Sequence, residues 1–272
     1  MRHRLALGSQ NTIGIPPNTT HHQVRHVHGR DVWLRYPPEP PSITTLHSTL
    51  YTLHPTLYTL HPTLYTTLLT TTRHIILGSQ SPRRRELMAG LDIPFSAITI
   101  DADETYPAHL QAGDIPMYIS RAKARAYEAQ LQPDDLLITS DTIVWLNGQM
   151  LGKPQSKEEA KQMLHLLSGQ THQVYTAVCF TWLNHTTQPY ITLHDTLVDC
   201  THVSFRTLSA EEIDYYVEKY LPLDKAGAYG VQEWIGYVGV ERMEGSYFNV
   251  MGFPIGPVYQ WLQDNHYISH TH

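Results

Sequence analysis

The 272-residue chain is poor in cysteine and has no long hydrophobic run, and each shortage narrows what the protein can be. Its two cysteines, Cys179 and Cys200, lie in no CxxC or Cys/His ligand pattern, so we expect two reduced thiols rather than a disulfide or a zinc site. No apolar run approaches the roughly 18 residues that a membrane-spanning helix needs, and no membrane partner is expected. The sequence also lacks a GxxxxGK[ST] motif, which excludes a P-loop enzyme.

The first ten residues, MRHRLALGSQ, lack the hydrophobic segment of a secretory signal. Secretion is therefore not predicted, and a cytoplasmic location is. The segment is poor in acid and contains arginine, so an organelle transit peptide is the alternative.

Charge is distributed unevenly along the chain. Five of the 19 Lys and Arg residues precede Arg73, as do two of the 25 Asp and Glu residues, which leaves 14 basic and 23 acidic residues in the remainder. A body with a net charge of about −9 argues against a nucleic acid polymer as partner. An anionic substrate would have to be held by a local cluster of cations.

Residues 1–72 differ in texture from the rest. Residues 45–65 are three near-copies of one heptapeptide, TLHSTLY, TLHPTLY and TLHPTLY, and the prolines at 55 and 62 prevent a coiled coil. Eight of the 18 histidines lie in this part, which is typical of a metal-binding tract. We favour the other interpretation, a low-complexity, disordered extension over 1–72 followed by one domain over 73–272.

From His74 onward, strands and helices alternate. Ser81 and Pro82 open a helix that runs to Gly90, Asn147-Gly148 marks a hairpin, and Ser156/Glu159 and Ser209/Glu212 are spaced as capping boxes. The pattern predicts an α/β protein with a mixed sheet flanked by helices. Strands are expected at 74–78, 95–100, 135–148, 173–184 and 196–208, the last two paired antiparallel, and further helices at 117–131, 156–169, 209–220 and 254–265.

The first candidate site is the turn from Gly78 to Arg84, between a strand and a helix. Backbone N–H groups at a helix N-terminus bind phosphate oxygens, and Ser79 and Ser81 add hydroxyl donors. Arg83 and Arg84 carry planar guanidinium groups that suit phosphate. The alternative is a capped helix with a solvated arginine run, but cations in a first turn oppose the helix dipole, which favours a bound anion.

The second candidate is Asp141, within the apolar strand sequence TSDTI. A buried carboxylate is costly unless it has a partner, so it must face a cleft, a metal or a cation, or accept backbone hydrogen bonds. The acidic pair Asp103 and Glu104 supplies further carboxylates. Each lysine alone reads as a surface residue except Lys225, which lies in a stretch of small residues close to Gln232, a side chain able to read a base edge. The candidate lysines are Lys123, Lys153 and Lys225.

These residues together meet the needs of a triphosphate hydrolase. Such an enzyme requires several cations, a divalent metal held by carboxylates, and a base that activates water. The sequence offers no nucleophile–base pair that suggests covalent catalysis.

Several separated blocks in the expected order give the chain a resemblance to the Maf proteins, also called septum-formation inhibitor proteins. SQSPRRRELM resembles the family signature SxSPRRxELL, and the match covers about 74–264. The resemblance does not cover 1–72, and residues 184–195 look longer than usual, which should lengthen a hairpin away from the cleft. Met251 and Phe253 are apolar replacements that should be tolerated. The other matching blocks are SDTIV, LGKP, LSGQTHQVYTAV, FRTLS, PLDKAGAYGVQ and GSYFNVMGFP.

The resemblance implies metal-dependent hydrolysis of a nucleoside triphosphate between the α and β phosphates. Asp141 falls at the position of the family's proton acceptor, and Glu104 with Asp141 would hold Mg²⁺ or Mn²⁺. Arg83, Thr142 and Gln232 fall at the specificity positions of the dTTP/UTP branch. By the resemblance, the substrate and metal cleft would be lined by Ser79, Arg83, Arg84, Glu104, Lys123 and Lys153. The residue patterns described above add Ser81 and Lys225 as substrate-binding candidates.

The family fold is similar to that of inosine triphosphate pyrophosphatases, with a long curved mixed sheet, two lobes and a central cleft. Members of the family are often cytoplasmic homodimers. Two alternatives to dTTP and UTP hydrolysis remain: the same reaction on 7-methyl-GTP or a modified nucleotide, and a non-catalytic regulator of cell division that binds nucleotide as a signal.

Overall fold

The computed structural model describes residues 22–27, 30–35, 69–186 and 188–270. The chain divides into two units, Met1–Tyr65 and Thr66–His272. In the first unit, β1 (His22–Val27) and β2 (Arg30–Arg35) form an antiparallel hairpin. The heptapeptide repeat lies outside the described residues.

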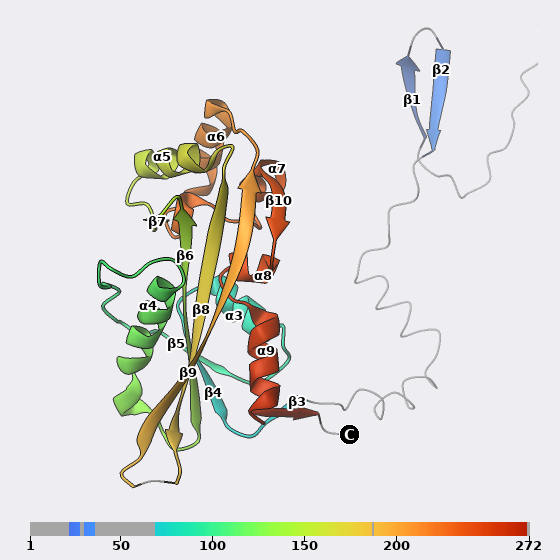
Figure 1. Cartoon of the computed structure of the whole chain (residues 1–272). Coiled ribbons are helices and arrows are strands. Elements are labelled where there is room, and N and C mark those ends of the chain that lie inside the picture. Colours follow the sequence, from blue (N-terminus) through green and yellow to red (C-terminus); the bar gives the residue numbers. More distant parts are fainter. Residues whose placement is uncertain (1–21, 28–29, 36–68, 187, 271–272) are drawn as a thin grey trace, which may run out of the picture. The chain divides into compact units, whose positions relative to one another are not determined.

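The second unit is organised around one seven-stranded mixed sheet of order β10-β9-β8-β6-β4-β5, with β7 paired to β6 (Figure 1). Strands β4, β5 and β6 are parallel, and the other pairings are antiparallel. This confirms the predicted mixed α/β architecture. The strands are β4 (His74–Gly78), β5 (Ser96–Ile98), β6 (Asp135–Leu146), β7 (Gln149–Leu151), β8 (Thr171–Asn184), β9 (Ile191–Phe205) and β10 (Val240–Glu244).

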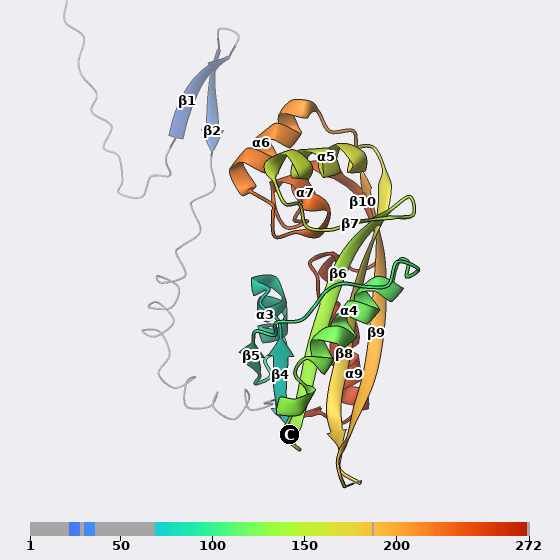
Figure 2. The same ribbon diagram turned by 90° about the vertical axis from the view of Figure 1, so that its left-hand side faces the viewer.

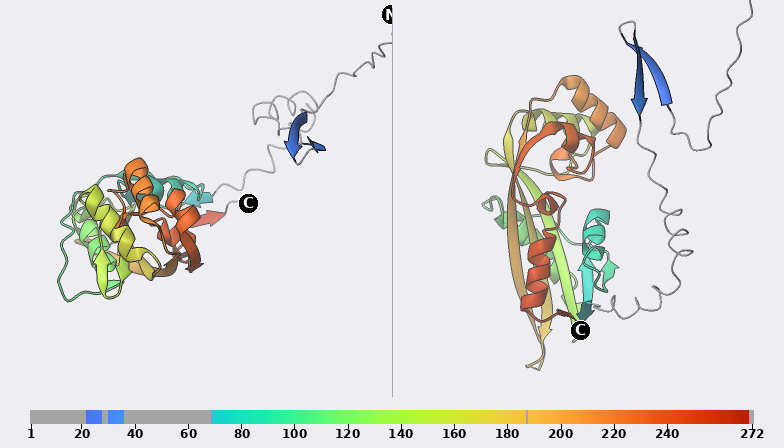
Figure 3. Two further views of the ribbon diagram at one scale, coloured as in Figure 1. Left: turned by 90° about the horizontal axis from the view of Figure 1, so that it is seen from above. Right: turned by 90° about the vertical axis from the view of Figure 1, so that its right-hand side faces the viewer.

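Helices cover both faces of the sheet because its central strand is apolar on both sides. On β6, Leu136 and Ile138 pack in a cluster with α3 (Pro82–Ala89) and α9 (Ile255–Asp264), whereas Leu137 packs with α4 (Asp114–Arg125). Alternate residues of a strand face opposite sides, so a continuous apolar run requires a layer on each. The right-hand view of Figure 3 shows α9 (red) in front of the long strands and α4 (green) behind them.

A second lobe forms at the other end of the long strands. There, strand residues Val144, Val174 and Phe205 pack in a separate core with α5 (Lys157–Leu167), α6 (Ala210–Tyr220) and α7 (Trp234–Gly239). Figure 2 shows these helices at one end of the strands, and α3, α4 and α9 toward the other end. The two expected lobes are therefore confirmed.

The local signals in the sequence are borne out unevenly. The Ser209/Glu212 capping box forms in full, and Asn147 and Gly148 join β6 to β7 with positive φ angles of 50° and 82°. Ser156 caps α5, but the Glu159 carboxylate accepts from the Gln155 N–H rather than from the cap residue, so the first predicted box is half-formed.

Several predicted elements have other bounds in the structure; the strand expected at 196–208, for example, is β9 and runs from Ile191 to Phe205. The helix expected at 117–131 begins at Asp114, because Pro116 is compatible with a first turn, and it ends at Arg125 before a separate 3-10 turn at Glu128–Gln130. The strand expected at 95–100 is paired only over Ser96–Ile98.

One strand lies within the stretch predicted to be an extension. β3 (Leu69–Thr71) pairs antiparallel with β11 (Ile268–His270), and Leu69 packs against the core that contains Ile268. The compact unit therefore begins before residue 73. At the far end of the sheet, β8 and β9 continue as a hairpin to Asn184 and Ile191, which fits the predicted long hairpin.

Candidate active site

A cleft of about 430 Å³ opens between the two lobes. Every residue proposed from the sequence as a substrate, metal or specificity residue lines this cleft. Asp103, which the sequence offered only as a further carboxylate, is not among the lining residues, and its carboxylate accepts from the backbone N–H and hydroxyl of Thr105. The lining includes Ser79, Ser81, Arg83, Arg84, Glu104, Lys123, Asp141, Thr142, Lys153, Lys225 and Gln232.

One wall is the turn between β4 and α3. The Ser81 hydroxyl caps the helix by accepting from the Arg84 N–H, and the Ser79 hydroxyl accepts from the Ser81 N–H at 3.2 Å. The first turn of α3 contains no acidic residue, so nothing in the sequence of the turn opposes an anion at this end of the helix.

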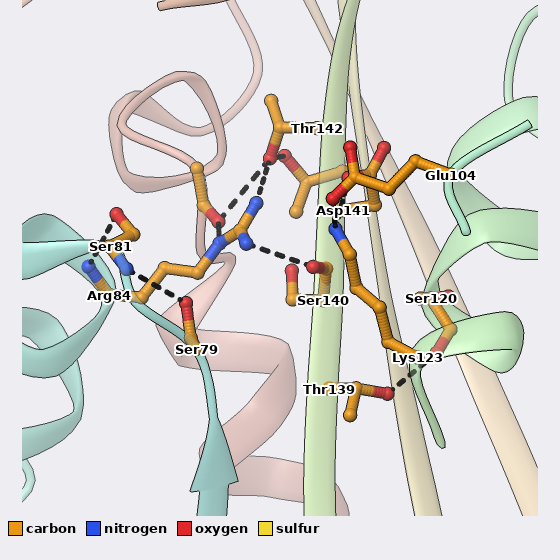
Figure 4. A network of polar contacts seen from close by, with 12 residues as sticks. Ser79, Ser81, Arg84, Glu104, Ser120, Lys123, Thr139, Ser140, Asp141 and Thr142 are labelled. Atoms are coloured by element: carbon orange, nitrogen blue, oxygen red, sulfur yellow. Dashed lines mark hydrogen bonds and ion pairs between the residues drawn. The ribbon is translucent and has the colours of Figure 1, made fainter. Parts of the chain in front are cut away.

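Arg84 lies half-buried beside this turn and crosses to the sheet. Its guanidinium donates to the Gly252 carbonyl at 2.7 Å, to the Ser140 carbonyl at 2.8 Å and to the Thr142 hydroxyl at 2.9 Å (Figure 4). Burial lowers the pKa of Arg84, yet arginine stays protonated because its ordinary pKa is so high. A fixed positive charge with neutral partners therefore faces the cleft.

Lys123 approaches the same strand from the other side, on α4 (Figure 4). Its ammonium lies 2.7 Å from Asp141 Oδ1 and 2.9 Å from Glu104 Oε1. We call Glu104, Lys123 and Asp141 the sheet triad. The triad joins a loop, a helix and the central strand, so its geometry is set by the packing of all three.

The electrostatics of the sheet triad differ between its two acids. Burial raises the pKa of Asp141 above its ordinary value, and Lys123 and Arg84 oppose this without cancelling it. Burial has the same tendency at Glu104, but Lys123, Lys153 and Arg84 outweigh it and lower the pKa of that carboxyl. Asp141 is therefore the acid whose proton affinity has moved toward neutrality, as a general base requires.

The facing wall carries a second lysine between two carboxylates. The lysine was a candidate from the sequence, but its two acidic partners were not. The Lys225 ammonium lies 2.7 Å from Asp224 Oδ1 and 3.1 Å from Glu233 Oε1. We call Asp224, Lys225 and Glu233 the loop triad. The other oxygen of Asp224 accepts from Arg83 at 3.1 Å. Asp224 precedes Lys225 in sequence and was available as a signal, whereas nothing in the pattern links Glu233 to the lysine.

The other two specificity candidates, Gln232 and Thr142, have different surroundings. Gln232 directly precedes Glu233 of the loop triad, and its backbone carbonyl accepts from the Tyr237 hydroxyl at 2.7 Å. The Thr142 hydroxyl instead bonds with Arg84 and with the Thr176 hydroxyl, so it helps to fix the Arg84 guanidinium.

The carboxylates available for a metal are limited. Within residues 22–27, 30–35, 69–186 and 188–270, no group of three or more His, Cys, Asp or Glu side chains is arranged to hold a metal ion. Glu104 and Asp141 nevertheless converge on one cation position, where the Lys123 ammonium lies. Two carboxylates with the remaining ligands supplied by phosphate and water is a normal arrangement for Mg²⁺.

The fold and the cleft define an α/β protein whose cleft sets arginine and lysine side chains around a buried carboxylate. The chain belongs to the family described as Maf-like protein, whose model matches residues 74–265. Among the described residues, no helix is long and apolar enough to cross a membrane.

Curated relatives cover nearly the whole compact unit. A Bacteroides thetaiotaomicron protein named dTTP/UTP pyrophosphatase is 54% identical over 190 residues, which is 70% of this chain and 94% of the relative. A Porphyromonas gingivalis protein of the same name is 50% identical over 193 residues, covering 70% and 93%. Among solved structures, the Staphylococcus aureus Ham1 protein matches with a TM-score of 0.41 and 15% identity, over 71% of this chain and all of that one.

Proposed function

We propose that the protein is a nucleoside triphosphate pyrophosphatase that hydrolyses dTTP and UTP to the monophosphate and pyrophosphate. The observation that carries the proposal is Asp141, a buried acid of raised pKa on the central strand, in a cleft whose other walls supply cations. The roughly 50% identity to relatives named dTTP/UTP pyrophosphatase supports the choice of substrate.

The triphosphate would lie across the N-terminus of α3. Hydroxyl and N–H donors of the 79–84 turn, with the half-buried charge of Arg84, would face phosphate oxygens, and Lys123 and Lys153 would reach them from the other side. Because Lys123 contacts only Oδ1 of Asp141, its Oδ2 is left to accept a proton from water. That water forms a bond to the α-phosphorus, the bond to the α–β bridging oxygen breaks, and pyrophosphate leaves.

A divalent metal is part of the proposal, with Glu104 and Asp141 as its protein ligands. When bound, Mg²⁺ or Mn²⁺ would neutralise charge on the phosphate oxygens. Its binding would require Lys123 to release at least one carboxylate oxygen, since the ammonium occupies the point on which both acids converge. Removing the metal with a chelator should abolish turnover, and adding Mg²⁺ back should restore it.

The decisive experiment follows the phosphorus products in ¹⁸O-labelled water. We would incubate the full chain and Mg²⁺ with dTTP, UTP, CTP, 7-methyl-GTP and GTP, and identify products by ³¹P NMR and mass spectrometry. The expected result is pyrophosphate with dTMP or UMP, and the label in the monophosphate. The label reports which phosphorus was attacked, independently of which nucleotide is preferred.

Other outcomes would redirect the proposal. Turnover of 7-methyl-GTP alone would keep the mechanism and change the substrate. Orthophosphate, or label in the pyrophosphate, would contradict attack at the α-phosphorus. Tight dTTP binding without any product would favour a nucleotide-binding regulator.

We propose that residues 66–272 suffice for this activity. β3 pairs with β11 and adds Leu69 to the core, so a truncation should begin before β3 rather than at residue 73. Deleting 1–65 should leave kcat/KM for dTTP within about twofold, because every residue that lines the cleft belongs to the second unit. Deleting 1–72 should in addition lower the melting temperature. A large loss of activity on deleting 1–65 would give the N-terminal unit a catalytic role.

The expected homodimer and the cytoplasmic location also stand as predictions. Light scattering on the purified full chain would establish the oligomeric state.

A further inference from the structure

We propose that Tyr216 and Glu233 form a positioning pair that holds Lys225 and the Gly230–Gln232 turn, and thereby sets how the cleft selects a nucleotide base. The inference rests on the proposed function, because it assigns a role in choosing the substrate of that reaction. Neither residue was found by sequence reasoning, and Tyr216 lies on α6, in the core of the second lobe.

The Tyr216 hydroxyl makes two hydrogen bonds, one to Glu233 and one with the Gly230 backbone. The Tyr216 hydroxyl donates to Glu233 Oε2 and accepts from the Gly230 N–H at 3.0 Å. A tyrosine hydroxyl has one proton to donate, so these two bonds commit its donor and an acceptor position. The Tyr216 side chain is fully buried, and water does not offer the Gly230 N–H a ready substitute.

Glu233 connects Tyr216 to Lys225, which lines the cleft. Its second oxygen accepts from Lys225 at 3.1 Å, and the Glu233 N–H donates to the Gly230 carbonyl at 3.0 Å. Glu233 therefore closes the short turn that contains Gln232 through its backbone N–H, and its carboxylate ties that turn to Tyr216 and Lys225. Replacing the charge with an amide would weaken the hold on Lys225 without changing the size of the side chain.

The backbone at Gly230 is built around this carboxylate. A Cβ atom at Gly230 would lie 2.8 Å from the Glu233 carboxyl carbon, which is too close for any real contact. Alanine at 230 would therefore push the Glu233 carboxylate away from Tyr216 and Lys225. This gives a way to disturb the pair without altering either of its members.

The charges on this wall suit a base rather than a phosphate. The ammonium of Lys225 is opposed by Asp224 and Glu233, and Asp224 also engages Arg83. On the 79–84 wall, by contrast, Arg84 has only neutral hydrogen-bond partners. The donors of the 79–84 turn and the Arg84 guanidinium would therefore hold the triphosphate, which leaves the uncharged base beside Gln232.

The test compares Glu233→Gln, Gly230→Ala and Tyr216→Phe in the full chain. We expect the ratio of kcat/KM for UTP over CTP to fall about tenfold in each, the effect of one lost charged hydrogen bond, because these two bases differ at the edge that Gln232 would read. KM for UTP should rise more than kcat falls, which a merely destabilised protein would not show. Measurements are made well below the melting temperature of each variant.

Two neighbours serve as matched controls. Tyr215→Phe removes an exposed hydroxyl of the same helix, which accepts from Lys219 at 2.7 Å. Glu244→Gln removes an exposed carboxylate paired with Arg242 on β10. Both should leave the UTP/CTP ratio as it is in the wild type.

A second readout needs no turnover. Hydrogen exchange in the peptide spanning Gly230 should quicken in Tyr216→Phe and stay unchanged in Tyr215→Phe. An unchanged UTP/CTP ratio in Glu233→Gln and Gly230→Ala would overturn the inference, as would unchanged exchange in Tyr216→Phe. If the wild type hydrolyses neither UTP nor dTTP while exchange still quickens, the proposed function fails and the positioning of the turn stands; UTP and CTP affinities then replace the kinetic ratio.

Discussion

The cleft holds a lysine between two carboxylates on each of its walls, and the two triads differ in what anchors them. The sheet triad draws its members from a loop, a helix and the central strand, and its Asp141 and Lys123 side chains are 12% and 13% exposed. The loop triad draws its members from one segment, residues 224–233, and its Asp224 side chain is 59% exposed.

This difference in anchoring changes the chemistry of the same charge pattern. Burial raises the pKa of Asp141, whereas at Asp224 the nearby Lys225 and Arg83 outweigh partial burial and lower the pKa. Asp141 can take up a proton during a reaction, while Asp224 stays ionised and serves as an anchor. We infer that the sheet triad performs proton transfer and that the loop triad orders the wall facing it.

The largest effect that would test this division is at Asp141. Asp141→Asn keeps an acceptor for Lys123 but cannot accept a proton, so kcat should fall by at least about 10³-fold, in the range of a lost general base. Asp134→Asn, an exposed acid beside the same strand, is the control and should retain activity. Full turnover by Asp141→Asn, measured as pyrophosphate release, would remove the proton acceptor from the mechanism.

Replacing each lysine with methionine tests whether the two triads have different roles. Lys123→Met leaves Asp141 buried without its ammonium, and kcat/KM for dTTP should fall about 10²-fold, as for other broken buried pairs. Lys225→Met should act mainly on KM, by about tenfold. Steady-state kinetics with dTTP distinguish them, with the exposed Lys157→Met as control. Identical changes in kcat and KM for both variants would mean that the triads do not differ in role.

How far sequence alone reaches can be judged from these same residues. The 79–84 turn and Asp141 were predictable because a capped helix after a strand and an acid within an apolar strand are local patterns. Arg84 was placed in the cleft correctly, but its bonds to Gly252 and Ser140 depend on how distant segments pack. Local patterns carry no such information.

The second triad shows where the limit lies. Its Glu233 was missed although Lys225 and Gln232 were named, since an acid beside a glutamine in a loop has no periodicity or cap to mark it. The Ser156/Glu159 spacing predicted a full capping box, and the glutamate bonds to Gln155 instead. Spacing limits which groups can meet, and packing decides which of them do.

A pH profile would sharpen the comparison further. As a general base, Asp141 must be deprotonated, so kcat/KM should rise with pH through a midpoint above the ordinary aspartate pKa of about 3.9. Because the Lys123 charge lowers this pKa, Lys123→Met should move the acid limb to higher pH. Lys225→Met should leave the limb in place. A shift of equal size in both variants would assign the midpoint to another group.

The smallest expected effect is on stability, and it has opposite signs in the two triads. The raised pKa of Asp141 contributes stability at low pH that is lost as pH rises through its folded pKa. The free energy of unfolding of the wild type should therefore fall relative to that of Asp141→Asn on going from pH 4 to pH 8. The lowered pKa of Asp224 contributes stability above its unfolded pKa that is lost on acidification, so wild type should gain against Asp224→Asn over the same interval.

The measurement is the free energy of unfolding in urea for the three proteins at both pH values. Other titrating groups cancel in each difference, which leaves the substituted acid and its immediate partners. The Asp224 effect should stay below about 1 kcal/mol because the side chain is largely exposed and solvent screens it. Differences of the same sign at both positions would mean that burial does not distinguish the two acids, and the assignment of proton transfer to the sheet triad would lose its physical basis.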